Sequence, residues 1–246
     1  MMDIDSDRNI AINKPNTWRE ELEKQQAENP FLPVHSIVHD ILWKKIITCK
    51  LEPGAPMKEI DLAERFCVSR TTIRNALDAL YAENLVQRKG RILRVTPITR
   101  AQYTQLHEFR RFVDPIAASL AASRRTKEDL ERLHTYLMDG DSDNPQAFME
   151  ADHKFHHMTY IASKNQYLLQ AYMQVVNDRN RINHFSVSSL AKNSLWDFSA
   201  SKRSRMREEH QKIFDAICQS DNHLAASLAR KHVGLLIFDF DSYEKK

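Results

Sequence analysis

The stretch VSRTTIRNALDALYAENLVQRKGRILRV, residues 68–95, combines two local patterns that together decide the fold. In its first half, apolar residues from Ile73 to Leu80 recur at the three- and four-residue spacing of an amphipathic helix. Ser69 can cap the start of this helix, and Asn84, a residue that tolerates left-handed backbone, follows its end. The second half has strand-forming residues on both sides of a lysine–glycine–arginine turn, which predicts a short hairpin.

Further helices are expected on both sides of this stretch. Apolar spacing predicts a helix over about residues 33–50, and a shorter helix over about residues 58–66 follows a proline–glycine turn. Helix, short helix, helix and hairpin in this order are typical of a winged helix-turn-helix domain, here residues 31–97. Helical patterns dominate residues 98–246, so the sequence predicts a mainly α protein: a winged helix-turn-helix domain followed by an all-helical antiparallel bundle.

Residues 1–30 are expected to be an N-terminal arm that is partly helical. The charged segment WREELEKQQAE can form a short helix, capped by Asn16 or Thr17 and ended by Asn29 and Pro30. Two interpretations follow: a poorly ordered arm, or a helix that docks on a partner subunit.

The composition is that of a protein with a normal core. Hydrophobic residues make up 42% of the 246 residues, and only four glycines occur, which favours helices. The three cysteines are far apart and form no CxxC pair, which suits a reducing compartment. Because no apolar run approaches the roughly 20 residues of a membrane span and the N-terminus lacks signal-peptide features, we expect a cytoplasmic protein without a membrane partner.

The basic residues are distributed unevenly. The net charge of the whole chain is only +3, too small to indicate a nucleic-acid-binding protein. It is −3 over residues 1–30, +4 over residues 31–97 and +2 over residues 98–246. A positive surface for phosphates is therefore expected on the winged helix-turn-helix domain.

Candidate DNA contacts lie on the helix and hairpin of the opening stretch. Arg70 and Arg74 fall on a helix face away from the apolar stripe. Arginine can fork onto guanine O6 and N7, while hydroxyls at a helix start suit phosphate oxygens. The alternative is a solvated basic helix in an unrelated helical domain. The predicted contacts are Ser69, Arg70, Thr71, Thr72, Arg74, Arg88, Lys89, Gly90 and Arg91, with Arg94 as a further hairpin contact.

The segment ADHKFHHMTYIA, residues 151–162, contains three histidines and an aspartate. At about 100° per residue, Asp152 and His156 flank the apolar face of the expected helix. His153 and His157 point away from that face and are expected to be solvated.

Two later histidines continue apolar stripes. His210 and His232 each recur at helical spacing with aliphatic residues and should point inward. A lone inward histidine is usually a hydrogen-bonded core residue, whereas three imidazoles and a carboxylate together suit Zn²⁺, Ni²⁺ or a similar ion. Both interpretations fit the pattern. The candidate metal ligands are Asp152, His156, His210 and His232.

Residues 53–99 closely resemble the winged-helix domain of the GntR family of bacterial transcription regulators. The resemblance rests on the proline–glycine turn, on LAERF-x-VSR-x-x-IR-x-AL and on the LV-x-x-x-x-GR hairpin. It implies operator binding through the matching Arg70 and Arg74. Ile60 stands where some relatives place an arginine that touches DNA, so no contact is carried over to residue 60.

The remaining chain resembles the FCD effector domain of the FadR subfamily of GntR regulators. The resemblance rests on TRAQYTQLHEFRRFVDPIAASLAASR, D-x-x-F-H, AS-x-NQYL and EEHQKIFDAI, and it covers most of residues 99–240. It implies an FCD-type helical fold and a bound divalent metal ion, for which zinc and nickel are the first candidates. The implied ligands are Asp152, His156, His210 and His232.

The same resemblance implies an effector site beside the metal. Four protein ligands of an octahedral set leave coordination positions for water or for the carboxylate of a small metabolite. Arg110 and Asn165 match family positions expected to bind it. The alternatives are a salt bridge from Arg110 to Asp114 and a helix cap from Asn165.

The expected function is that of a homodimeric, ligand-responsive transcription regulator that binds double-stranded operator DNA. A metal sensor without an organic effector shares every residue with this interpretation. A metal-dependent hydrolase is a third possibility, but the sequence lacks an H-E-x-x-H motif, a placed glutamate base and a nucleophile motif. We therefore do not expect an enzyme.

Overall fold

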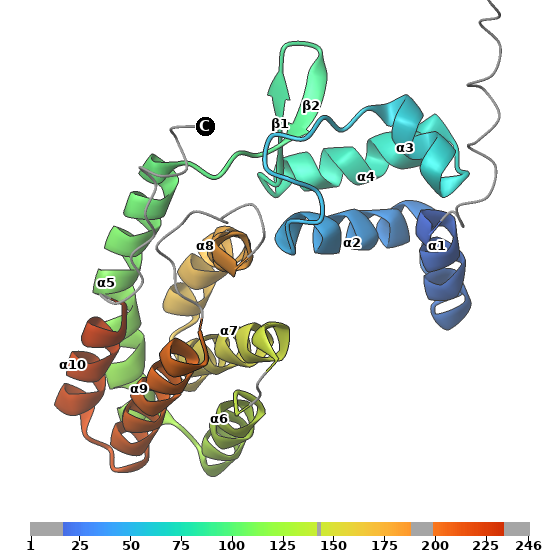
Figure 1. The fold of residues 1–246 in the computed structure, drawn as a ribbon. Coiled ribbons are helices and arrows are strands. Elements are labelled where there is room, and N and C mark those ends of the chain that lie inside the picture. The colour runs from blue at the N-terminus through green and yellow to red at the C-terminus, as the bar shows by residue number, and fades with distance from the viewer. Residues whose placement is uncertain (1–16, 142–143, 188–198, 234–246) are drawn as a thin grey trace, which may run out of the picture. The chain divides into compact units, whose positions relative to one another are not determined.

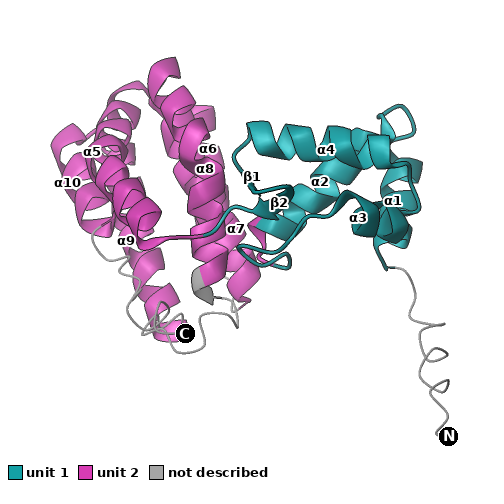
Figure 2. Ribbon diagram, turned by 90° about the horizontal axis from the view of Figure 1, so that it is seen from above, with its two compact units in different colours: residues 1–46, 50–97 teal, residues 47–49, 98–246 magenta. Residues whose placement is uncertain are grey.

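The computed structural model describes residues 17–141, 144–187 and 199–233 (Figure 1). Within these ranges the chain forms ten helices and one two-stranded antiparallel sheet. The backbone divides into two compact units, residues 1–46 with 50–97 and residues 47–49 with 98–246 (Figure 2). The predicted mainly α fold, a winged helix-turn-helix followed by a helical bundle, is confirmed.

The first unit is the winged helix-turn-helix. Apolar side chains from its helices and strands form its core, with Ile41, Leu42, Ile73 and Leu80 fully buried. The hairpin strands pair in register from Val86 opposite Val95. The elements are α1 (Thr17–Glu28), α2 (Val34–Ile47), α3 (Glu59–Phe66), α4 (Arg70–Ala82), β1 (Val86–Lys89) and β2 (Ile92–Val95).

Local backbone chemistry fixes the turn between α3 and α4. Cys67 adopts a left-handed conformation (φ 54°) that ends α3. The Ser69 hydroxyl then accepts a hydrogen bond from the Thr72 amide at 3.1 Å and caps α4, as the sequence predicts. Asn84 (φ 59°) and Gly90 (φ 64°) supply the left-handed positions after α4 and in the hairpin turn. These caps and turns present one face of α4 beside the hairpin.

Helix α1 belongs to the first unit. The Trp18 ring meets the Phe66 ring edge-on at 5.2 Å, Leu22 is buried, and Lys45 forms an ion pair with Glu21. This part of the arm is an ordered helix that packs on its own chain, and its docking on a partner subunit stays a prediction. Residues 1–16, including the candidate cap Asn16, lie outside the described residues.

The second unit is a bundle in which α10 packs along α5. Small residues permit this close approach, with Ala118, Ala121 and Ala122 of α5 sharing one core cluster with Ala225 and Ala229 of α10. None of the described helices is long and apolar enough to cross a bilayer. The elements are α5 (Arg100–Arg124), α6 (Lys127–Asp139), α7 (Pro145–Ala162), α8 (Gln166–Val187), α9 (Ala200–Cys218) and α10 (Asn222–Val233).

Candidate functional site

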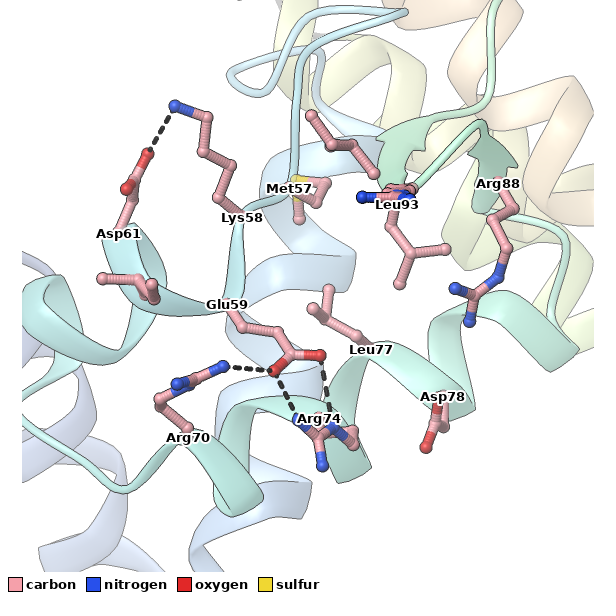
Figure 3. Close-up of a pocket in the computed structure, with 13 residues that line it drawn as sticks. Met57, Lys58, Glu59, Asp61, Arg70, Arg74, Leu77, Asp78, Arg88 and Leu93 are labelled. Atoms are coloured by element: carbon pink, nitrogen blue, oxygen red, sulfur yellow. Dashed lines mark hydrogen bonds and ion pairs between the residues drawn. The ribbon is translucent and has the colours of Figure 1, made fainter.

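A groove of about 680 Å³ lies between α3, α4 and the hairpin of the first unit (Figure 3). Its lining combines apolar residues, among them Leu77 and Leu93, with charged residues. The cationic side chains lie just before α3, on α4 and on the hairpin: Lys58, Arg70, Arg74, Arg88 and Arg91. The groove thus presents guanidinium groups beside the start of a capped helix, the arrangement expected of a DNA-reading surface.

The residues predicted to contact DNA differ in their exposure and in the hydrogen bonds that they already form. Arg70, Thr71 and Arg74 are exposed on α4, and Arg88, Lys89, Gly90 and Arg91 are exposed on the hairpin. The Ser69 hydroxyl is used in the helix cap and lies 2.8 Å from the Thr72 hydroxyl. Arg94 is half-buried and donates to the Gly54 carbonyl at 2.9 Å, so it anchors the hairpin instead of lining the groove.

Glu59 is a groove residue that the sequence reasoning missed. Its carboxylate accepts two hydrogen bonds from Arg74, from Nε at 3.2 Å and from Nη2 at 2.8 Å. Arg70 Nη2 lies 3.7 Å from the same carboxylate. The hydrogen bond from Arg74 holds the pKa of Glu59 below its ordinary value. No local sequence signal links these residues, because packing of α3 on α4 brings them together.

The second unit brings together all four candidate metal ligands. Asp152 and His156 come from α7, His210 from α9 and His232 from α10, and all four are buried. His232 Nε2 lies 3.2 Å from His156 Nε2 and 3.1 Å from His210 Nε2. Asp152 Oδ1 lies 3.6 Å from His156 Nε2 and 3.4 Å from His210 Nε2. One ligand atom from each residue lies within 4.8 Å of the others, which defines the four-residue cluster.

Two further side chains form hydrogen bonds with ligands of the cluster, and the sequence reasoning missed both. Arg179 Nη2 donates to Asp152 Oδ2 at 2.6 Å, which leaves Oδ1 directed at the histidines. Glu209 Oε2 lies 2.9 Å from His232 Nδ1. Because a carboxylate only accepts, Nδ1 carries the proton and His232 Nε2 presents a lone pair to the cluster.

The charges of the cluster are those of a ligand set. Burial opposes ionisation of Asp152, but the positive charge of Arg179 and the neighbouring His156 hold its pKa well below the ordinary value. Burial lowers the pKa of His156, and burial with the neighbouring His232 lowers the pKa of His210 to about 3. His156 and His210 are therefore neutral imidazoles at neutral pH, and Asp152 is a carboxylate.

These residues fit a divalent metal ion. Neighbouring ligands at about 2.0–2.1 Å from one ion lie about 2.9 Å apart in octahedral coordination and about 3.3 Å apart in tetrahedral coordination. The imidazole nitrogen separations of 3.1 and 3.2 Å fall within this range, so they also fit an ion that keeps positions beyond its four protein ligands. Three imidazoles and a carboxylate suit Zn²⁺ or Ni²⁺, and the carboxylate behind His232 is the partner that metal-binding histidines usually have.

Both predicted effector contacts have a structural partner. Arg110 is buried and donates to Asp114 Oδ2 at 3.0 Å, while Tyr160 donates to Asp114 Oδ1 at 2.6 Å. The Asn165 side-chain oxygen accepts hydrogen bonds from the amides of residues 167 and 168 and caps α8. The salt bridge and the helix cap are thus both present. Contact of either residue with an effector stays a prediction.

A small cavity adjoins the cluster. It measures about 10 Å³ and is lined by Asp114, His156, Tyr160 and His232, among others. This is room for about one water molecule. Arg179 does not line this cavity but contacts Asp152, and its buried Nε and Nη1 atoms have no hydrogen-bond partner among the described residues. An organic ligand would need the surrounding helices to separate before it fits the cavity or reaches those donors.

The expectation that His153 and His157 are solvated is wrong. Both are half-buried against α8, where Tyr172 lies 3.4 Å from His153 Nδ1 and stacks on His157 at 5.7 Å. Burial lowers the pKa of His153 to about 4. Neither belongs to the four-residue cluster. Helical phase placed them away from the α7 core face, but α8 covers the side on which they lie.

Comparison with known families identifies both units. Residues 36–92 match the family described as bacterial regulatory proteins, gntR family. Residues 105–235, more than half of the chain, match the FCD domain family. The four-residue cluster falls within the FCD match, and the groove falls within the gntR match except for Leu93.

Several curated and solved proteins are similar to the chain. It is 31% identical over 210 residues to the HTH-type transcriptional regulator LutR of Bacillus subtilis (strain 168), covering 75% of this chain and 90% of LutR. It is 27% identical to the galactonate operon transcriptional repressor of Escherichia coli (strain K12), covering 76% and 88%. The solved structure of E. coli McbR/YncC matches with a TM-score of 0.67 at 17% identity, covering 83% and 95%, which shows a shared fold.

Proposed function

This chain belongs to the GntR family of bacterial transcription regulators with an FCD domain, and we propose that it binds operator DNA as a homodimer and senses a small carboxylate at a metal centre. It is a transcription regulator and not an enzyme, as are the relatives that it matches. The observation that carries the sensing part is the convergence of three imidazoles and one carboxylate in the unit attached to a winged helix-turn-helix.

The DNA-reading part of the proposal rests on the groove. Helix α4 would enter the major groove with Arg70 and Arg74 facing base edges. The hairpin residues Arg88, Lys89 and Arg91 would contact the phosphate backbone, and the exposed Gly90, which has no side chain, would allow its close approach. A homodimer would read two half-sites of a near-palindrome, in the cytoplasm where the chromosome lies.

The metal would be held by the four-residue cluster. Bound zinc or nickel would supply Lewis acidity and open coordination positions for a carboxylate oxygen. Arg179 keeps Asp152 ionised and oriented, while Glu209 fixes the proton on His232 Nδ1. Arg110 and the unsatisfied nitrogens of Arg179 would pair with the remaining effector charge.

An effector of this kind could influence the packing of the bundle. The cavity beside the cluster holds about one water and is lined by side chains from α5, α7, α9 and α10. Binding an organic carboxylate there would favour a more open arrangement of these helices, which is how a ligand shifts a conformational equilibrium. One relative is named for the galactonate operon, and galactonate is a carboxylate, which supports this effector class.

The test begins with a binding-site selection from random DNA using the purified protein. We expect the selected duplex to bind at least about a thousandfold more tightly than random DNA at fixed salt. A carboxylate effector should raise the melting temperature of the zinc-loaded protein and change its operator affinity. No preference for any sequence would contradict the regulator, and a change in DNA affinity with metal alone would favour the metal-sensing alternative.

Replacing Glu209 with glutamine is expected to weaken zinc binding by about 10–100-fold, the usual effect of losing a carboxylate behind a metal-bound histidine. The amide would leave the His232 tautomer unspecified, so its Nε2 lone pair would no longer be guaranteed. The matched control is Glu208→Gln, because Glu208 is the exposed neighbour. Competition with a chromophoric chelator measures both affinities, and equal effects of the two substitutions would remove the role assigned to Glu209.

A further inference from the structure

We propose that Glu59 is a positioning residue that determines how specifically the groove reads DNA. The inference rests on the proposed operator binding and adds a residue that touches no base itself. Glu59 begins α3, whereas Arg70 and Arg74 occupy the first two turns of α4. Figure 3 shows its carboxylate lying between the two guanidinium groups and contacting both.

The geometry of the Arg74 contact decides which donors remain. Glu59 takes the Nε and Nη2 hydrogens, which form the side-on edge of the guanidinium. The end-on edge, made by Nη1 and the second Nη2 hydrogen, stays available. That edge is a fork of two parallel donors, which matches guanine O6 and N7. Glu59 therefore holds Arg74 with its base-reading edge free and its other edge occupied.

The charge of Glu59 has a second consequence. The groove carries five cationic side chains, and a carboxylate among them lowers its attraction for any phosphate backbone. Binding to random DNA depends mainly on that attraction, whereas binding to the operator also uses the oriented arginine forks. Removing the carboxylate should thus strengthen the first kind of binding and weaken the second.

The chain offers a matched control in the same groove. Asp61 also lines it, but its nearest cation is Lys58 at 3.7 Å. Asp61→Asn and Glu59→Gln each remove one negative charge from the groove, and only the second releases an arginine that faces base edges. Any difference between them is due to positioning and not to charge.

The experiment measures the dissociation constants of the full-length protein for its selected duplex and for random DNA by fluorescence anisotropy at two salt concentrations. We expect Glu59→Gln to lower the ratio of specific to random affinity by about tenfold, the scale of one well-formed bidentate base contact. Asp61→Asn should change it less than threefold. Glu59→Asp, which keeps the charge on a shorter stem, should lose less than Glu59→Gln, and melting curves check that all three variants fold.

A double-mutant cycle separates positioning from a general effect. If Glu59 acts through Arg74, the glutamine substitution should change the ratio much less when Arg74 is already alanine. Equal effects of Glu59→Gln and Asp61→Asn, or full effect of Glu59→Gln without Arg74, would overturn the inference while leaving operator binding intact. A wild-type protein without sequence preference would instead overturn the proposed function, and this inference with it.

Discussion

Replacing His156 with alanine is expected to lower zinc affinity at least about a hundredfold, while replacing the adjacent His157 leaves it unchanged. Four ligands of a structural zinc site share about 10–16 kcal/mol, so one ligand contributes on the order of 3 kcal/mol, or about a hundredfold. His156 Nε2 faces His232 Nε2 at 3.2 Å, whereas His157 stacks on Tyr172 outside the cluster. Elemental analysis and chelator competition measure the difference.

The two histidines form a stringent pair because they are neighbours on one helix. Each substitution removes one imidazole from α7, so a loss of helix stability alone would lower the zinc affinity of both variants to a similar extent. Zinc should raise the melting temperature of the wild type and of His157→Ala, since a ligand bound to the folded state stabilises it. Zinc should raise the melting temperature of His156→Ala only slightly. Equal loss of zinc from both variants would refute the assignment of His156 as a ligand.

Much of this site could be predicted because helical phase is a local property. The apolar stripe of α7 places Asp152 and His156 beside the core, and the stripes of α9 and α10 place His210 and His232 within it. That four residues on three helices meet follows from packing, and here the family resemblance supplied what phase could not. Helical phase also correctly placed His153 and His157 away from the core face of α7, but it did not predict that α8 covers that side.

The residues that were missed act on other side chains. Glu209 and Arg179 act on metal ligands, and Glu59 acts on two arginines. Each contact joins different helices, separated by 15 to 27 residues in the chain. A charged residue of this kind looks like an ordinary surface residue in the sequence, because only tertiary packing creates its partner.

The winged helix was more predictable because its signals are local. The Ser69 cap and the left-handed Asn84 are both observed. Helix α1 was harder, because half of its twelve residues are charged and only Leu22 among them is buried. Its packing depends on Trp18 meeting Phe66, a contact between helices far apart in the sequence.

Replacing both Arg70 and Arg74 with alanine is expected to weaken operator binding by about a hundredfold or more and binding to random DNA much less. Each base-reading arginine contributes about 1–3 kcal/mol. Both arginines are exposed on α4 in the groove, and the Glu59 contact leaves the end-on edge of Arg74 free. Anisotropy titrations with the selected and random duplexes measure the two affinities.

The salt dependence of these titrations separates base reading from phosphate contact. An arginine that contacts a phosphate reduces the slope of log affinity against log salt by about one when removed, whereas a base contact changes affinity and relaxes sequence preference. Arg65 lies on α3 and is not among the residues that line the groove, so Arg65→Ala serves as the control for loss of one positive charge. If the double variant loses the same factor on operator and random DNA with a slope reduced by about two, both arginines contact phosphates. Base reading would then have to come from other exposed residues of α4, of which Thr71 and Asn75 are the candidates on that helix.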